Sequence, residues 1–271
     1  MTALRASALR LGNPGFDGVL RVVEHRLLLY RRSWRGSVIS SFLTPTLFLA
    51  SIGLGLGGLV DARGSALGVP YVVFLAPGLL AGTAMQTAAG EATFPVMSGF
   101  LWSRSFQAMA VTPLGPRQIA VGFLCWVGLR LAFVCAVYVA IIAAFGAAAS
   151  PLVVLAIPAG VLTGLAFAAP IAAYSATQRE TQGFNALFRF GITPLFIFSG
   201  TFFPIDQLPW FLQPVAWLTP LFHGVSLARD LALGTIGAHP LETAVHVGYL
   251  AALVALGTWL AIVTFTRRLE K

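Results

Sequence analysis

Long uncharged stretches, separated by short segments that carry charges, dominate the hydropathy pattern of this chain. Residues 36–60 and 64–90, for example, contain no Asp, Glu, Lys or Arg. A helix needs about 20 mostly apolar residues to cross the hydrocarbon core of a bilayer. The pattern therefore predicts an all-α polytopic membrane protein with six transmembrane helices. They are expected at about residues 36–58, 71–90, 118–145, 152–174, 184–203 and 243–265.

Residues 16–35, ahead of the first expected span, alternate between apolar and charged positions with the period of a helix. The apolar positions are Phe16, Val19, Leu20, Val23, Leu27, Tyr30 and Trp34, and the charged ones are Asp17, Arg21, Glu24, Arg31, Arg32 and Arg35. Such a helix lies on the membrane surface, with its apolar face among the acyl chains and its cations near anionic headgroups. The residues expected to make these interface contacts are Arg21, Arg31, Arg32 and Trp34.

The segment 204–235 is too rich in proline to form one straight helix. Each of Pro204, Pro209, Pro214 and Pro220 lacks an N–H group and would clash with the preceding turn of a helix. Trp, Phe and Leu fill the gaps between these prolines, so an ordinary hydrophilic loop is also a poor fit. We expect a re-entrant helical hairpin on the outer membrane face, tolerated because protein or cavity water satisfies its backbone groups. The hairpin either gates an exit or statically completes the bundle, and its candidate residues are Phe203, Pro204, Pro209, Trp210, Pro220 and His223.

Residues 93–115 are too polar and too interrupted for another span. Arg104 lies within this stretch and Arg117 follows it, which places the segment on the cytoplasmic side. We expect a cytoplasmic loop that contains a helix.

Composition and charge agree with a membrane protein and exclude several other classes. Hydrophobic residues make up 58% of the chain and charged residues 10%, whereas about 25% is usual in soluble domains. The net charge of +8 does not indicate nucleic-acid binding, because the cations gather at the chain ends and in short loops. With both termini cytoplasmic, only Arg63 and Arg229 are expected outside, which satisfies the positive-inside rule. The predominance of Arg over Lys is typical of a GC-rich bacterial genome, so the expected location is a bacterial plasma (inner) membrane.

Two sequence patterns resemble those of a known family. The run SGTFFPIDQLP is followed by P-L-x-H-x-x-x-L-x-R from Pro220 to Arg229, and the pattern R-x-F-x-x-M-x-x-T-P-L covers Arg104 to Leu114. Together with the basic carboxyl-terminal tail, these patterns resemble ABC-2 type exporter permeases. The closest branch includes the nodulation-factor and antibiotic-resistance permeases.

The resemblance implies partners and a coupling site. Such permeases work in pairs, identical or homologous, with two ATP-binding cassette subunits that hold ATP and magnesium, and no cofactor is expected on this chain. The segment 93–115 would then hold the coupling helix that sits in a groove of the ATPase, and the interface helix would border the same subunit. The implied coupling residues are Arg104, Phe106, Gln107, Met109, Thr112 and Pro113. Relatives often have an acidic residue where this chain has Gln107, so a salt bridge at that position is not expected.

The chain lacks the residues for catalysis of its own. A phosphate-binding loop needs a lysine, and the only lysine is the last residue, Lys271. The four histidines form no metal-binding pattern such as HExxH, so no metal site is expected. We expect a non-catalytic permease for amphipathic cargo such as drugs, lipids or lipid-linked oligosaccharides. The alternative is an ion- or proton-coupled secondary exporter, which the scarcity of acidic residues within the spans disfavours.

One charged residue lies inside an expected span. Arg130 falls near the middle of residues 118–145, where an arginine is costly unless it finds a partner or reaches the headgroups. Pairing inside the bundle and snorkelling toward the cytoplasm both remain open.

Overall fold

The computed structural model describes residues 16–31, 43, 46–62 and 68–270 of the chain. These residues form helices and turns, with no strand in the described ranges. The helices and helical turns, with π-helical and 3-10 segments marked η, are α2 (Phe16–Tyr30), η2 (Leu49–Leu56), α4 (Gly57–Ala62), α5 (Tyr71–Ala92), α6 (Phe94–Leu101), α7 (Ser105–Ala110), α8 (Pro116–Ala144), η3 (Pro151–Leu155), α9 (Ala156–Thr177), α10 (Gln182–Ala186), η4 (Leu187–Ile192), α11 (Thr193–Phe198), η5 (Ile205–Gln207), α12 (Gln213–Trp217), α13 (Pro220–Leu233) and α14 (Pro240–Leu269).

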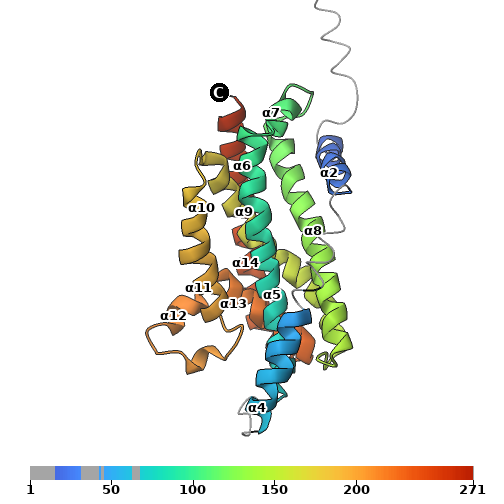
Figure 1. Ribbon diagram of the computed structural model, residues 1–271, viewed down its shortest axis with the longest axis vertical. Coiled ribbons are helices and arrows are strands. Elements are labelled where there is room, and N and C mark those ends of the chain that lie inside the picture. Colours follow the sequence, from blue (N-terminus) through green and yellow to red (C-terminus); the bar gives the residue numbers. More distant parts are fainter. Residues whose placement is uncertain (1–15, 32–42, 44–45, 63–67, 271) are drawn as a thin grey trace, which may run out of the picture.

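The long helices run side by side along the longest axis of the molecule (Figure 1). The end of α14, together with α6 and α7, lies at one end of this bundle, and α4 and α12 lie at the other. Within the residues that the structure describes, four helical stretches are long and apolar enough to cross a membrane: Tyr71–Leu101, Pro116–Ala144, Pro151–Thr177 and Pro240–Leu269. They overlap the expected spans 71–90, 118–145, 152–174 and 243–265.

The remaining two expected spans, 36–58 and 184–203, are not among these four stretches. Much of the first lies outside the described residues, and the described part contains a shorter apolar helix at Thr46–Ala62. Helix covers residues 182–198 through α10, η4 and α11, which is about 25 Å at the α-helical rise. The helix therefore ends before the expected limit at residue 203. Gly200 has a φ of +80°, and this left-handed conformation at a residue without Cβ turns the chain out of the helix.

Small residues allow the helices to approach closely. A Cβ added at Gly164 of α9 would lie 2.6 Å from Leu131 of α8, and one at Gly257 of α14 would lie 2.6 Å from Pro170 of α9. Most of α5 is buried, so this helix forms the centre of the bundle. By contrast, α14 exposes Leu241, Val245, Leu256 and Trp259, as a helix facing acyl chains would.

Candidate functional site

The expected coupling region folds into two short helices that continue from α5. Helix α6 follows α5 after a break at Thr93, and α7 begins after Arg104, whose φ of +49° is unusual for a residue with a side chain. The Gln107 Nε2 atom donates a hydrogen bond to the Phe100 carbonyl oxygen at 2.7 Å. This bond fixes α7 to α6, so the two short helices and α5 form one connected element.

Phe106 and Met109 face the protein's own bundle. The Phe106 side chain is fully buried, and its ring centroid lies 4.9 Å from that of Phe100 and 5.2 Å from that of Phe265. Gly99 makes room for it, because a Cβ there would lie 2.4 Å from the Phe106 ring. These two apolar residues of the sequence-based site therefore position α7, rather than projecting from it.

A different set of residues is exposed around α7. Arg104, Thr112 and Pro113 from the sequence-based site are exposed, and so are two side chains that it omitted, Trp102 at 62% and Val111 at 88%. Trp102 precedes the motif and Val111 occupies one of its unspecified positions, so the motif gave no signal for either residue. Together, Trp102, Arg104, Val111, Thr112 and Pro113 form what we call the α7 surface.

Helix α2 packs on α8 through a face that the sequence pattern did not predict. Gly18 and Val22 are buried, and a Cβ at Gly122 of α8 would lie 2.6 Å from Val22. Phe16 and Leu20, from the expected apolar stripe, are 72% and 51% exposed. Phe16 and Leu20 thus point away from the bundle, whereas Tyr30 of the same stripe packs on Trp126 of α8. Of the expected interface residues, Arg21 and Arg31 are exposed, and Arg32 and Trp34 lie outside the described residues.

Arg26 belongs to the buried face of α2. Its guanidinium lies over the rings of Phe106 and Phe123, 5.1 and 5.2 Å from their centroids, so it contacts the aromatic cluster under α7. Burial lowers the pKa of Arg26, and the carboxylate of Glu91 opposes that shift. The sequence pattern placed this arginine in neither stripe of the helix, because a cation over aromatic rings follows neither an apolar nor a polar periodicity.

The same carboxylate gives Arg130 a partner. The Arg130 Nη2 atom lies 3.2 Å from Glu91 Oε1, with both side chains largely buried, and the Arg130 guanidinium lies 4.5 Å from the Tyr30 ring centroid. The sequence left pairing and snorkelling open for Arg130, and in the structure Arg130 pairs with a neighbouring helix. Glu91, Arg26, Arg130 and Tyr30, which we call the Glu91 cluster, join α2, α5 and α8 near the end of the bundle that carries α7.

The outer hairpin has two parts that differ in packing. Helix α13 lies inside the bundle, where Gly224 allows Thr163 of α9 to approach to 2.3 Å from where a Cβ would lie. The part from Pro204 to Leu218 has a small core of its own around Ile205, Leu208 and Ala216, but exposes large apolar side chains. These are Trp210, Phe211, Val215, Trp217 and Leu218.

Arg229 fastens α13 to the rest of the bundle. Its Nη2 atom donates to the Gly200 carbonyl oxygen at 2.9 Å and its Nε atom donates to the Phe74 carbonyl oxygen at 3.3 Å. The guanidinium also lies 3.8 Å from the Phe74 ring centroid. The expectation that Arg229 is an outer-loop charge is wrong, because its partners are carbonyl oxygens and a ring inside the protein, which hydropathy counts cannot detect.

Side-chain contacts also join α13 to α14. The Nδ1 atoms of His223 and His246 are 2.7 Å apart, and the Tyr249 hydroxyl donates to the Leu218 carbonyl oxygen at 2.6 Å. His223 is thus a packing residue between two helices, and its ring also stacks on that of Tyr249.

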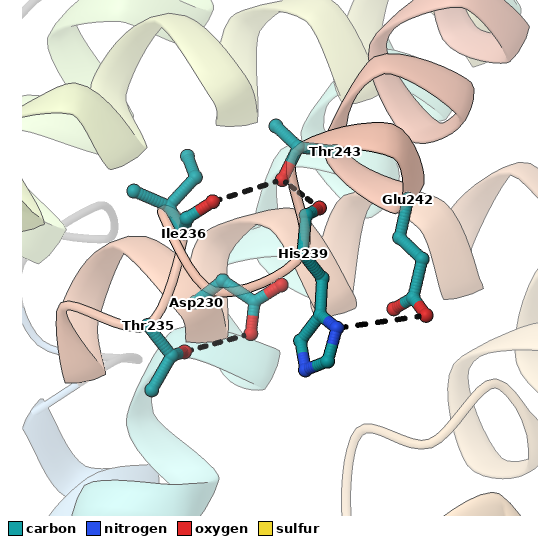
Figure 2. Close-up of polar contacts among 6 residues, drawn as sticks. All are labelled: Asp230, Thr235, Ile236, His239, Glu242 and Thr243. Atoms are coloured by element: carbon teal, nitrogen blue, oxygen red, sulfur yellow. Dashed lines mark hydrogen bonds and ion pairs between the residues drawn. The ribbon is translucent and has the colours of Figure 1, made fainter.

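The turn between α13 and α14 is itself held by hydrogen bonds (Figure 2). The Thr235 hydroxyl donates to Asp230 Oδ1 at 3.0 Å, and the Thr243 hydroxyl contacts the Ile236 and His239 carbonyl oxygens at 3.4 and 3.2 Å. The hairpin is therefore firmly attached at its carboxyl-terminal end and more exposed at its amino-terminal part.

Comparison with known proteins shows the family of the chain. Residues 19–233 match the ABC-2 type transporter family. The chain belongs to that family. It is 32% identical over 251 residues to nodulation protein J of Rhizobium leguminosarum bv. trifolii, which covers 92% of this chain and 93% of that protein. It is 30% identical over 253 residues to nodulation protein J of Rhizobium leguminosarum bv. viciae, covering 93% and 95% of the two chains. The chain is therefore a membrane transport component of the ABC-2 type, for which the family implies an ATP-binding partner.

Proposed function

We propose that this chain is the permease of an ATP-driven exporter that moves amphipathic cargo out across a bacterial inner membrane. It works beside a second permease, identical or homologous, and two ATP-binding subunits, which hold the ATP and magnesium. Both termini lie in the cytoplasm. The proposed cargo class is a drug, lipid or lipid-linked oligosaccharide, and membership of the ABC-2 type transporter family supports a transport role of this kind.

The observation that carries this proposal is that α5 connects the two ends of the molecule. At one end it continues into α6, to which α7 is bound by Gln107, and it carries Glu91 of the Glu91 cluster. At the other end its Phe74 carbonyl oxygen accepts from Arg229 of the outer hairpin. A displacement of α7 by an ATPase would be transmitted along this packed helix to the hairpin, because a close-packed interior does not absorb such a shift.

The outer hairpin is proposed as the gate of the exit. Its α13 part is fixed to α5 and α14, whereas the part from Pro204 to Leu218 exposes apolar side chains that suit contact with cargo, lipid or a second permease. In the resting protein this part closes the exit. It opens when the ATPases close on ATP and shift the first and fifth spans.

The α7 surface supplies a direct test. Arg104→Glu and Val111→Asp change exposed residues, so each should leave the bundle intact while weakening co-purification of the ATP-binding subunit by about tenfold or more, as interface anchors do. The matched control is Glu242→Lys, a charge reversal of the same size on an exposed side chain near the opposite end. Loss of co-purification in the control as well, or retention in both α7 variants, would contradict the assignment.

A further inference from the structure

In the helical segment from Gln182 to Phe198, several of the exposed positions carry polar side chains, unlike those of a helix that faces acyl chains. Gln182, Asn185, Arg189 and Thr193 recur at spacings of three and four residues, and all four are exposed. We call these four residues the polar stripe. The opposite face carries Phe184 and Ile192, which are buried. The polar side chains therefore point away from the bundle.

A helix that faces acyl chains shows the reverse pattern, as α14 does with its exposed Leu and Trp side chains. Exposed polar groups and a cation at membrane depth are costly against hydrocarbon, so they face water or a polar ligand. At the α-helical rise, Gln182 and Thr193 are separated by about 16 Å, roughly half the hydrocarbon thickness. Beyond Thr193 the exposed side chains are Ile197 and Phe198, which are apolar. In the topology proposed above, the polar stripe thus lies on the cytoplasmic side of the expected fifth span, and the exposed apolar side chains lie on its outer side.

The charge of the polar stripe is positive. Within the described ranges neither ion pair involves Arg189, and its guanidinium lies 5.8 Å from the ring of Phe190, which is itself 75% exposed. Both residues lie in the π-helical segment η4. Such wide turns occur often at functional sites. A cation beside an exposed aromatic ring, with amide and hydroxyl groups one turn away on each side, matches a ligand that has a negative charge and neutral hydrogen-bonding groups.

We propose that the polar stripe binds the anionic head group of amphipathic cargo taken from the inner leaflet. This inference rests on the proposed function. Arg189 pairs with the negative charge, Gln182, Asn185 and Thr193 bind neutral polar groups, and Phe190 contacts the adjoining apolar part of the cargo. A second permease packed symmetrically on the polar stripe is the less favourable occupant, because an isologous contact centred there brings Arg189 against its own copy.

Binding to the full transporter in phosphatidylcholine nanodiscs tests this site. The probes are lysophosphatidic acid and the monoacylglycerol with the same acyl chain, which differ by the phosphate. We expect tighter binding of lysophosphatidic acid, and a Kd about tenfold higher in Arg189→Gln, since hydrogen bonds to charged groups contribute on this order. Arg189→Lys should recover most of the affinity, and binding of monoacylglycerol should not change.

Arg267→Gln is the matched control, because it removes an exposed arginine outside the polar stripe. Equal affinity of the wild type for the two probes, an equal loss with both probes in Arg189→Gln, or an equal loss in Arg267→Gln would overturn the proposal. If the polar stripe held a resident membrane lipid, its affinity for lysophosphatidic acid would be the same with and without vanadate-trapped ATPases. Cargo, by contrast, should be released in the trapped state. Unchanged affinity on trapping would therefore also overturn the cargo role.

ATPase activity in the same nanodiscs separates this inference from the proposed function. Selective binding of lysophosphatidic acid without any ATP hydrolysis would contradict the proposed function and leave the anion-binding site standing. ATP hydrolysis stimulated equally by both probes would leave the exporter standing and overturn the site.

Discussion

One arginine contacts α5 near each end of the bundle, and the two contacts differ chemically. Near α7, Arg130 pairs with the carboxylate of Glu91, and Arg26 lies close to the same charge. At the outer end, Arg229 forms no ion pair within the part of the chain that the structure describes, and it binds two carbonyl oxygens and an aromatic ring. One acid shared by two cations makes the first arrangement dependent on charge. The second depends on geometry, because carbonyl oxygens have to lie where the planar guanidinium reaches them.

The largest effect should come from the aromatic cluster under α7. Phe106→Ala removes a fully buried ring that contacts Phe100, Phe123 and Phe265, so the cavity should lower the free energy of unfolding by about 3 kcal/mol or more. Thermal unfolding of the purified protein in detergent measures this change. Val111→Ala, at an exposed neighbour of α7, should shift the Tm little, and equal shifts in the two variants would show that Phe106 is not a core residue.

The outer attachment should be sensitive to shape as well as charge. Arg229→Met removes the guanidinium donor from the carbonyl oxygens of Phe74 and Gly200 and should cost about 2 to 4 kcal/mol. Arg229→Lys keeps the charge but cannot reproduce the planar donors, so it should recover only part of that loss. The free energy of unfolding of both variants is the measurement. Full recovery with lysine would show that charge alone matters at this end.

The inner attachment should respond to charge balance. Glu91→Leu leaves Arg130 without its ion-pair partner, and Arg130→Leu leaves Glu91 with only Arg26 close by. The double variant removes both members of the ion pair, so the two losses should not add. We expect a coupling energy of about 1 to 2 kcal/mol in a double-mutant cycle. Arg130→Leu should reduce transport more than expression. Additive losses, with normal transport in Arg130→Leu, would mean that the ion pair has no role.

The smallest effect concerns the exposed part of the hairpin. Cysteines at Gln207 and Leu218, in a background without Cys125 and Cys135, should react with an impermeant thiol reagent from the outside. The gate hypothesis expects a change of about twofold or more in the labelling rate when the ATPases are trapped with nucleotide. A cysteine at His239, in the hydrogen-bonded turn before α14, is the control and should label equally in both states. Equal labelling at all three positions would favour a static plug.

The sequence predicted the helical class, the overlap of four apolar stretches with the spans and the interrupted outer segment, because these depend on composition and proline spacing. It could not predict which arginines are buried. Arg229 and Arg26 are stabilised by carbonyl oxygens and aromatic rings from distant parts of the chain, and periodicity contains no information on such partners.

The sequence also could not predict on which side of α7 the expected coupling residues lie. A motif gives the order of Phe106 and Met109 but not the side on which α7 packs, which is decided by the space at Gly99 and the ring of Phe265. The end of the fifth expected span was placed too late for a similar reason. Apolar composition continues to Phe203, but the left-handed Gly200 ends the helix first.

The proposed function requires that ATP use by a partner subunit drives export through this permease. The most direct measurement is uptake of a fluorescent amphipathic cargo into inside-out vesicles that contain the permease and its ATP-binding subunit. We expect uptake that requires ATP, continues when a protonophore collapses the proton gradient, and is lost when the Walker lysine of the ATP-binding subunit is replaced. Uptake that stops with the protonophore and survives the Walker substitution would contradict the proposed function and assign the chain to secondary export.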